Sequence, residues 1–92
     1  MFNTPEIRIL VSEEQKGAIV EEIKNHLVAQ GTNVIDIDGI RVTTPEGWWL
    51  LRASNTQNMI VLRVEASTKE GLSTLQESLV TYLAKRGISL SF

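Results

Sequence analysis

The most constraining feature of this chain is a succession of short apolar, β-branched runs separated by turn sequences. Asp38-Gly39 stands between the runs 34–37 and 40–43, and an Asp-Gly pair in that position predicts a tight hairpin. Residues 44–47, Thr-Pro-Glu-Gly, predict a second turn, in which proline presets one backbone angle and glycine supplies a positive φ. The middle of the chain is therefore expected to form an antiparallel sheet, with a further strand over about 48–52.

Two helices are expected, one before and one after this strand series. Ser12 begins a capping-box pattern, apolar residues then recur at helical spacing, and Gly31 ends the helix. The same capping pattern at 67–70 predicts that a second helix begins near Thr68, and Gly87 ends it. Each helix has a single apolar stripe, so both are expected to cover the same face of the sheet.

A first strand over 5–11 and a last strand over 59–66 complete the order β-α-β-β-β-β-α. The sequence predicts a two-layer α+β domain with a mostly antiparallel sheet, formed by residues 1–92 as one unit. The strand 59–66 is expected to be central and well covered. The other sheet face is expected to be partly open. Trp48 and Trp49 must point to opposite faces, and the sequence leaves open which one is buried.

Composition excludes several functional classes. The chain has no cysteine and a single histidine, His26, which argues against thiolate chemistry, a Ser-His-Asp system and a zinc site. The net charge of −2 argues against a general nucleic-acid binder. No apolar run approaches the roughly 20 residues of a membrane span, and no signal peptide opens the chain. A cytoplasmic protein is expected.

The candidate site is the polar stretch 53–58 between two apolar strands. Arg52 precedes this stretch and Arg63 lies in the following strand, so two positive charges can flank one loop. The polar side chains that the loop offers include those of Ser54, Asn55 and Thr56. Hydroxyls, an amide and planar guanidinium groups suit a small oxyanion, with phosphate first.

Other interpretations of the same residues remain open at this stage. The stretch 53–58 could be a plain polar hairpin loop, and Glu65 could form a surface ion pair with Arg63. The exposed member of the Trp48-Trp49 pair could stack on a sugar or base, or contact a partner. No nucleophile has an adjacent base and no metal cluster is present, so the residues indicate binding without catalytic machinery.

Three segments carry a resemblance to a known family: 38–42 (Asp-Gly-Ile-Arg-Val), 47–57 (Gly-Trp-Trp-Leu-Leu-Arg-Ala-Ser-Asn-Thr-Gln) and 61–66 (Val-Leu-Arg-Val-Glu-Ala). With the opening residues 4–9, they strongly resemble the C-terminal domain of the α-D-phosphohexomutases. Within that superfamily the chain looks most like the bacterial phosphomannomutase/phosphoglucomutase branch. Phosphoglucosamine mutases usually have Arg-x-Ser-Gly-Thr here, so Asn55 favours the former branch.

The resemblance implies a fold similar to the TATA-binding protein and a loop that holds the non-transferred phosphate of the substrate. Carried over residue by residue, the phosphate ligands would be Arg52, Ser54, Asn55 and Thr56, with Arg63 supporting or joining them. Gln57, Asn58 and Trp49 depart from the family pattern, so the resemblance assigns them no role.

The resemblance also implies the fourth domain of a four-domain enzyme that interconverts the 1- and 6-phosphates of glucose or mannose. Its phosphoserine, magnesium and sugar-selecting loops would belong to the other three domains, so this domain alone is expected to catalyse nothing and to need no cofactor. The expected partners are a phosphosugar and those three domains, with no nucleic acid and no membrane. A stand-alone gene product is the alternative to an excised domain. The alternative function is a non-enzymatic interaction module that docks a partner domain through the open sheet face.

Overall fold

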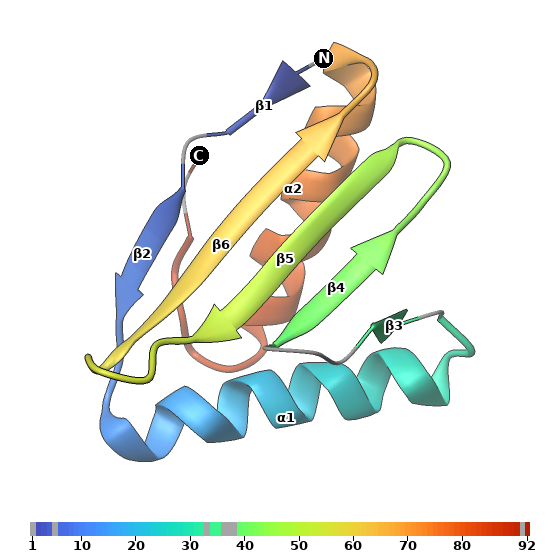
Figure 1. The fold of residues 1–92 in the computed structure, drawn as a ribbon. Coiled ribbons are helices and arrows are strands. Elements are labelled where there is room, and N and C mark those ends of the chain that lie inside the picture. The colour runs from blue at the N-terminus through green and yellow to red at the C-terminus, as the bar shows by residue number, and fades with distance from the viewer. Residues whose placement is uncertain (1, 5, 33, 36–38, 91) are drawn as a thin grey trace.

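The computed structural model of the protein describes residues 2–4, 6–32, 34–35, 39–90 and 92, which form one sheet and two helices (Figure 1). The elements in chain order are β1 (Phe2–Asn3), β2 (Ile7–Leu10), α1 (Glu13–Ala29), β3 (Val34–Ile35), β4 (Ile40–Thr43), β5 (Gly47–Ala53), β6 (Met59–Ala66) and α2 (Lys69–Ala84). The predicted order is confirmed, with one addition: the short β1 precedes the first predicted strand.

The six strands form a single antiparallel sheet in the order β1-β6-β5-β4-β3, and β2 also pairs with β6. β5 and β6 are therefore the central strands. Leu51 of β5 is in register with Ile40 of β4 on one side and with Leu62 of β6 on the other. The β3–β4 pairing is antiparallel as predicted, while Asp38 of the predicted turn lies outside the described residues.

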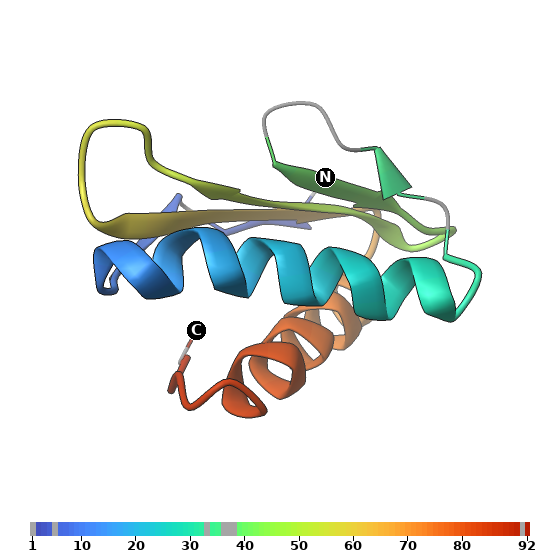
Figure 2. The same cartoon turned by 90° about the horizontal axis from the view of Figure 1, so that it is seen from below.

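Both helices cover the same face of the sheet, as predicted, and the other face is open (Figure 2). Alternation along the strands sends one apolar set of side chains toward the helices. Trp49 belongs to this set, with 2% of its surface exposed, so it is the buried tryptophan. The core consists mainly of Ile19, Ile23, Leu27, Ile40, Val42, Trp49, Leu51, Ile60, Leu62, Val64, Leu75, Leu79 and Leu83.

The capping prediction is confirmed for the first helix, and the start of the second helix near Thr68 is also confirmed, but Ser67 of the 67–70 pattern is not its cap. In α1, the Gln15 N–H donates to Ser12 Oγ (3.1 Å) and the Ser12 N–H donates to Gln15 Oε1 (3.0 Å). In α2 the N-cap is Thr68, whose hydroxyl accepts the Gly71 N–H (2.9 Å). Ser67 is not the cap: its N–H (3.0 Å) and its hydroxyl (3.4 Å) both donate to Glu46 O, which ties the end of β6 to the β4–β5 turn.

The turn at 44–47 forms as predicted, but Gly47 does not supply a positive φ, which Gly31, Gly39 and Gly87 do. Gly47 begins β5 and pairs with Ala66. A Cβ at position 47 would overlap the Glu65 carbonyl oxygen and the Ala66 Cα. Glycine is therefore required here by the close approach of β6 and not by the turn conformation.

Candidate anion-binding site

The polar loop between β5 and β6 is organised by one of its own hydroxyls. Ser54 Oγ accepts hydrogen bonds from the Thr56 N–H (3.3 Å) and the Gln57 N–H (3.2 Å). The base of the loop is closed because the Ser54 N–H donates to Met59 O (3.0 Å). A hydroxyl that accepts two hydrogen bonds still has its proton to donate. Ser54 can therefore shape the loop and also donate a hydrogen bond to an anion.

The loop is also held by the segment that starts α1. The Val11 N–H donates to Asn58 O (3.0 Å), and Lys16 Nζ donates to Gln57 O (3.3 Å). Lys16 thus brings a third positive charge near the loop, which the sequence interpretation missed. Figure 2 shows the loop rising on the side of the sheet opposite the helices. The loop therefore projects toward the open face of the sheet.

The two predicted arginines lie on that same face. Arg52 pairs with Val61, and Arg63 pairs with Leu50, so Arg52 and Arg63 are diagonal neighbours on β5 and β6. Diagonal positions are about 7–8 Å apart, which is within reach of two long side chains that converge on one anion. Both arginines are exposed. The expectation that β6 is well covered is wrong for this face, so the exposed Arg63 carries no cost of a buried unpaired charge.

Neither arginine has an acidic partner in the described part of the chain. The ion pairs found there join Arg8 to Glu6, Lys24 to Glu21, and Arg86 to Glu22. Glu65, which has the right parity to reach Arg63, forms no ion pair with it in this set. The surface ion-pair interpretation of Arg63 is thus not supported. Within the ranges that the structure describes, the side chains of Arg52 and Arg63 have no hydrogen-bond partner, so their N–H donors can bind a ligand.

Gly39 is the second residue whose importance to the site the sequence interpretation missed. It adopts a φ of +117°, and a Cβ built on it would lie 2.5 Å from Leu51 O, 2.6 Å from Arg52 Cβ and 2.9 Å from Arg52 Cα. The sequence assigned Gly39 only to a hairpin turn. The register Ile40–Leu51 places position 39 beside Arg52, and this register is the signal that could have identified the contact.

The remaining candidate residues are not part of this site. Trp48 is half-buried on the open face, and the Arg41 guanidinium carbon lies 4.4 Å above its ring. His26 contacts Tyr82 edge to face (5.7 Å between ring centroids) and so takes part in packing between the two helices. Among the residues described, no group of three or more His, Cys, Asp or Glu could hold a metal ion. The magnesium implied for the whole enzyme has no fitting ligand set there.

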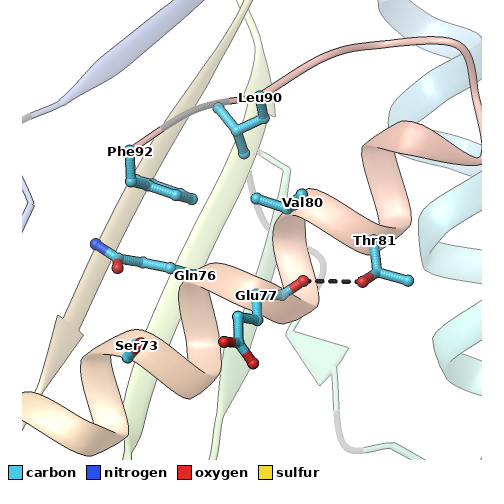
Figure 3. A pocket seen from close by; sticks show the side chains of 7 residues that line it. All are labelled: Ser73, Gln76, Glu77, Val80, Thr81, Leu90 and Phe92. Carbon is cyan, nitrogen blue, oxygen red and sulfur yellow. Dashed lines mark hydrogen bonds between the residues drawn. The ribbon is translucent and has the colours of Figure 1, made fainter.

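A hollow of about 490 Å³ lies in the helix layer, between α2 and the C-terminal tail (Figure 3). Its lining residues are Ser73, Gln76, Glu77, Val80, Thr81, Leu90 and Phe92. The charged side chain among them is the carboxylate of Glu77, which disfavours an anionic ligand. Because the hollow lies in the helix layer, it is separate from the arginines and the loop, which lie on the other side of the sheet.

No helix in the described ranges is both long enough and apolar enough to cross a membrane. The fold and the loop together define a two-layer α+β domain with a polar loop between its two central strands, which carry Arg52 and Arg63. Residues 6–81 match the family model described as phosphoglucomutase/phosphomannomutase, C-terminal domain. The chain belongs to this family, as its C-terminal domain.

Individual relatives agree with this assignment. The chain is 45% identical over 75 residues to a phosphomannomutase/phosphoglucomutase of Pseudomonas aeruginosa, which covers 82% of the chain and 16% of that protein. It is 41% identical over 77 residues to a phosphoglucomutase of Neisseria meningitidis serogroup B, covering 82% of the chain and 17% of the relative. The chain therefore spans about a sixth of the length of these relatives.

A solved structure is similar over nearly the whole chain. The crystal structure of a phosphoglucomutase/phosphomannomutase family protein from Burkholderia thailandensis superposes with a TM-score of 0.80 at 32% sequence identity. This similarity covers 99% of the chain and 19% of the Burkholderia chain. The similarity agrees with the predicted α+β architecture.

Proposed function

We propose that this domain binds the non-transferred phosphate of a phosphosugar during reversible 1-/6-phosphate interconversion by a phosphomannomutase/phosphoglucomutase. The observation that carries the proposal is the position of Arg52 and Arg63. They lie side by side on the open sheet face, without an acidic partner in the part of the chain that the structure describes, and next to a loop rich in hydroxyls and amides. Glucose and mannose phosphates are the expected ligands.

The donors available in the loop fit the oxygens of a phosphate group. The Arg52 guanidinium can donate two parallel hydrogen bonds to a phosphate, and the Ser54 and Thr56 hydroxyls can donate one each. Asn55 adds its side-chain amide, and Arg63 adds positive charge from the neighbouring strand. Because these groups recognise phosphate and not the sugar, the sugar can turn over and present either of its phosphates to the same loop.

Catalysis belongs, in this proposal, to the part of the enzyme outside this domain. The loop holds one end of the substrate, which fixes the orientation of the other end. This domain's own residues bind and orient the phosphosugar in this proposal, and the magnesium-binding loop belongs to the other domains. The isolated domain is expected to bind phosphate weakly and to leave a phosphosugar chemically unchanged.

The proposal is tested by an NMR titration of the isotope-labelled domain with inorganic phosphate and then with glucose 1-phosphate. We expect saturable amide shifts at positions 52–56 and 63, with millimolar affinity, about −4 kcal/mol. Arg52→Ala should weaken binding at least about tenfold, because a hydrogen bond to a charged group is worth about 1.5–3 kcal/mol. The control is Lys85→Ala, which removes an exposed cation at the end of α2 and should leave the affinity unchanged.

Two outcomes of this titration would contradict the proposal. One is shifts that are scattered over the surface or absent up to about 50 mM phosphate, well above the expected dissociation constant. The other is an equal loss of affinity in Arg52→Ala and Lys85→Ala, which would indicate general attraction of anions and not a defined site.

A further inference from the structure

Four of the five arginines of this chain lie on the open face of the sheet, although the net charge of the chain is −2. They are Arg8 on β2, Arg41 on β4, Arg52 on β5 and Arg63 on β6. The fifth, Arg86, lies in the helix layer and pairs with Glu22 (3.4 Å). Like charges that share one face repel each other, so an anionic partner bound on this face would reduce the electrostatic repulsion among the arginines.

The four arginines are too widely spaced to serve one phosphate. Arg41 and Arg8 lie on strands separated by β5 and β6, which places them about 14 Å apart across the sheet. The proposed phosphate loop uses Arg52 and Arg63 at one end of this face. Arg41 and Arg8 extend the positive surface on both sides of the two central strands, beyond the reach of the loop's ligand.

Apolar side chains lie between the arginines. Val61 is only 6% exposed although it points away from the helices, and its register partners on the two sides are Arg8 and Arg52. The aliphatic stems of these arginines account for such burial, since arginine packs its stem on apolar surface and keeps its guanidinium in water. Leu50 and Trp48 continue the apolar strip along β5, and Arg41 is held over the Trp48 ring.

We propose that the open face of the sheet is a docking surface for a polypeptide segment that carries carboxylates. We define this arginine face by Arg8, Arg41, Trp48, Leu50 and Arg63. Arginine and tryptophan are among the residues that contribute most to binding energy in protein interfaces, and here they surround a partly apolar centre. Charge complementarity sets the sign of the partner. The part of the mutase outside this domain, about five sixths of the relatives' length, is the source of such a segment that the family suggests.

A single-stranded nucleic acid fits this face less well. Base stacking needs an accessible aromatic ring, and Arg41 already covers one side of Trp48. Glu65 stands opposite Trp48 in the sheet, and Glu6 pairs with Arg8 (3.0 Å), so carboxylates lie beside the arginines. These carboxylates would repel a phosphate backbone. Side chains of a protein partner can be arranged to avoid them.

The test is an NMR titration of the 92-residue chain with an oligoglutamate peptide at low ionic strength, and separately with a single-stranded oligothymidylate. We expect the peptide to produce saturable shifts along β4, β5 and β6 and at the Trp48 indole N–H, and to bind more tightly than the oligonucleotide. Arg41→Glu should weaken peptide binding about tenfold and leave the affinity for inorganic phosphate within about twofold. Lys85→Glu changes the net charge by the same amount and should weaken peptide binding much less.

Each other result overturns the docking proposal. No saturable binding of the peptide up to about 1 mM would show that the arginines do not form an interface for carboxylates. Tighter binding of the oligothymidylate would identify a nucleic-acid surface. Shifts confined to positions 52–58 would show that the peptide only occupies the phosphate loop. Equal effects of Arg41→Glu and Lys85→Glu on peptide binding would show that the net charge of the chain, and not this face, attracts the peptide. Phosphate binding by the unaltered chain is measured separately, so the docking proposal can fail while the proposed phosphate function stands, and the reverse.

Discussion

The two faces of the sheet are formed by the same strands but differ in burial and in charge. On the face that the helices cover, the side chains of Val42, Trp49, Leu51 and Leu62 are 3% exposed or less. On the open face, arginines from these strands and from β2 lie beside partly covered apolar residues. Burial of apolar surface stabilises the fold, whereas exposed charges contribute little to stability. The comparison indicates that the covered face supplies most of the stability of the fold, and the proposed function assigns ligand binding to the open face.

Two consecutive residues of β6 should show the largest difference in stability between the two faces. Leu62 is fully buried, so Leu62→Ala is expected to lower the free energy of unfolding by about 2–5 kcal/mol. Arg63 is exposed on the opposite face, so Arg63→Ala should change it by less than about 0.5 kcal/mol. Urea denaturation followed by circular dichroism measures both. Comparable destabilisation by the two substitutions would refute the division of roles between the faces.

Substitutions at two glycines with positive φ, one beside Arg52 and one far from it, give a second comparison of stability. Gly39→Ala should cost about 2–4 kcal/mol, because alanine would occupy a positive φ and its Cβ would also press on the Leu51 carbonyl oxygen and on Arg52. Gly31 has a φ of +78° and no atom within 4 Å of a built Cβ, so Gly31→Ala should cost only about 1–2 kcal/mol. Urea denaturation gives the two stabilities.

The same two variants test whether Gly39 positions Arg52. In NMR titrations of the folded proteins, Gly39→Ala should weaken phosphate binding severalfold, and Gly31→Ala should leave it unchanged. Equal phosphate affinity in both would show that the contact between Gly39 and Arg52 matters for stability alone.

Local patterns predicted most of the fold, because they act within a few residues. The run of four apolar residues at the start of 59–66 predicted β6 with its observed bounds, and the Ser12 capping box is present as expected. Errors arose where distant parts of the chain meet. Ser67 has the right spacing for a cap, but a hydrogen bond to Glu46, 21 positions earlier, uses its N–H. Local spacing holds no information about such a contact.

The candidate site shows the same division. The donors of the loop were predictable because Ser54, Asn55 and Thr56 are neighbours in sequence. The placement of Arg63 on an open face depends on which side the helices cover. The contacts of Gly39 and Lys16 depend on sheet register and on the position of α1. The role of the loop in binding phosphate stays a prediction until the titration is done.

The hydroxyl of Ser54 offers a smaller test, within the loop itself. Ser54→Ala removes the acceptor of two backbone N–H groups and should cost about 1 kcal/mol. The amides of Thr56 and Gln57 should then exchange with solvent several times faster, as measured by hydrogen exchange NMR. Thr56→Ala is the control, because Ser54 bonds to the main chain of Thr56. If both variants leave these exchange rates unchanged, the loop is not organised by Ser54.

The smallest expected effect concerns the contact between Arg41 and Trp48 on the open face. A guanidinium over a solvent-accessible indole ring is worth about 0.5–1 kcal/mol, and Trp48 is half-buried, so a double-mutant cycle of Arg41→Gln and Trp48→Leu should give a coupling free energy of about that size. The cycle is measured by urea denaturation at low and at high salt. Glu65 stands opposite Trp48 and is the alternative partner that Arg41 could reach.

Salt distinguishes these two partners. An exposed ion pair between Arg41 and Glu65 would lose most of its coupling at about 1 M salt, where the screening length is about 3 Å. A guanidinium in contact with an aromatic ring should keep most of its coupling, because dispersion and ring contact are not screened in this way. Coupling between Arg41 and Trp48 that is absent, or that disappears in high salt, would show that the ring does not hold the guanidinium, and would remove the fixed guanidinium from the arginine face. Coupling that persists would leave Arg41 held over Trp48 with its N–H groups available to a carboxylate.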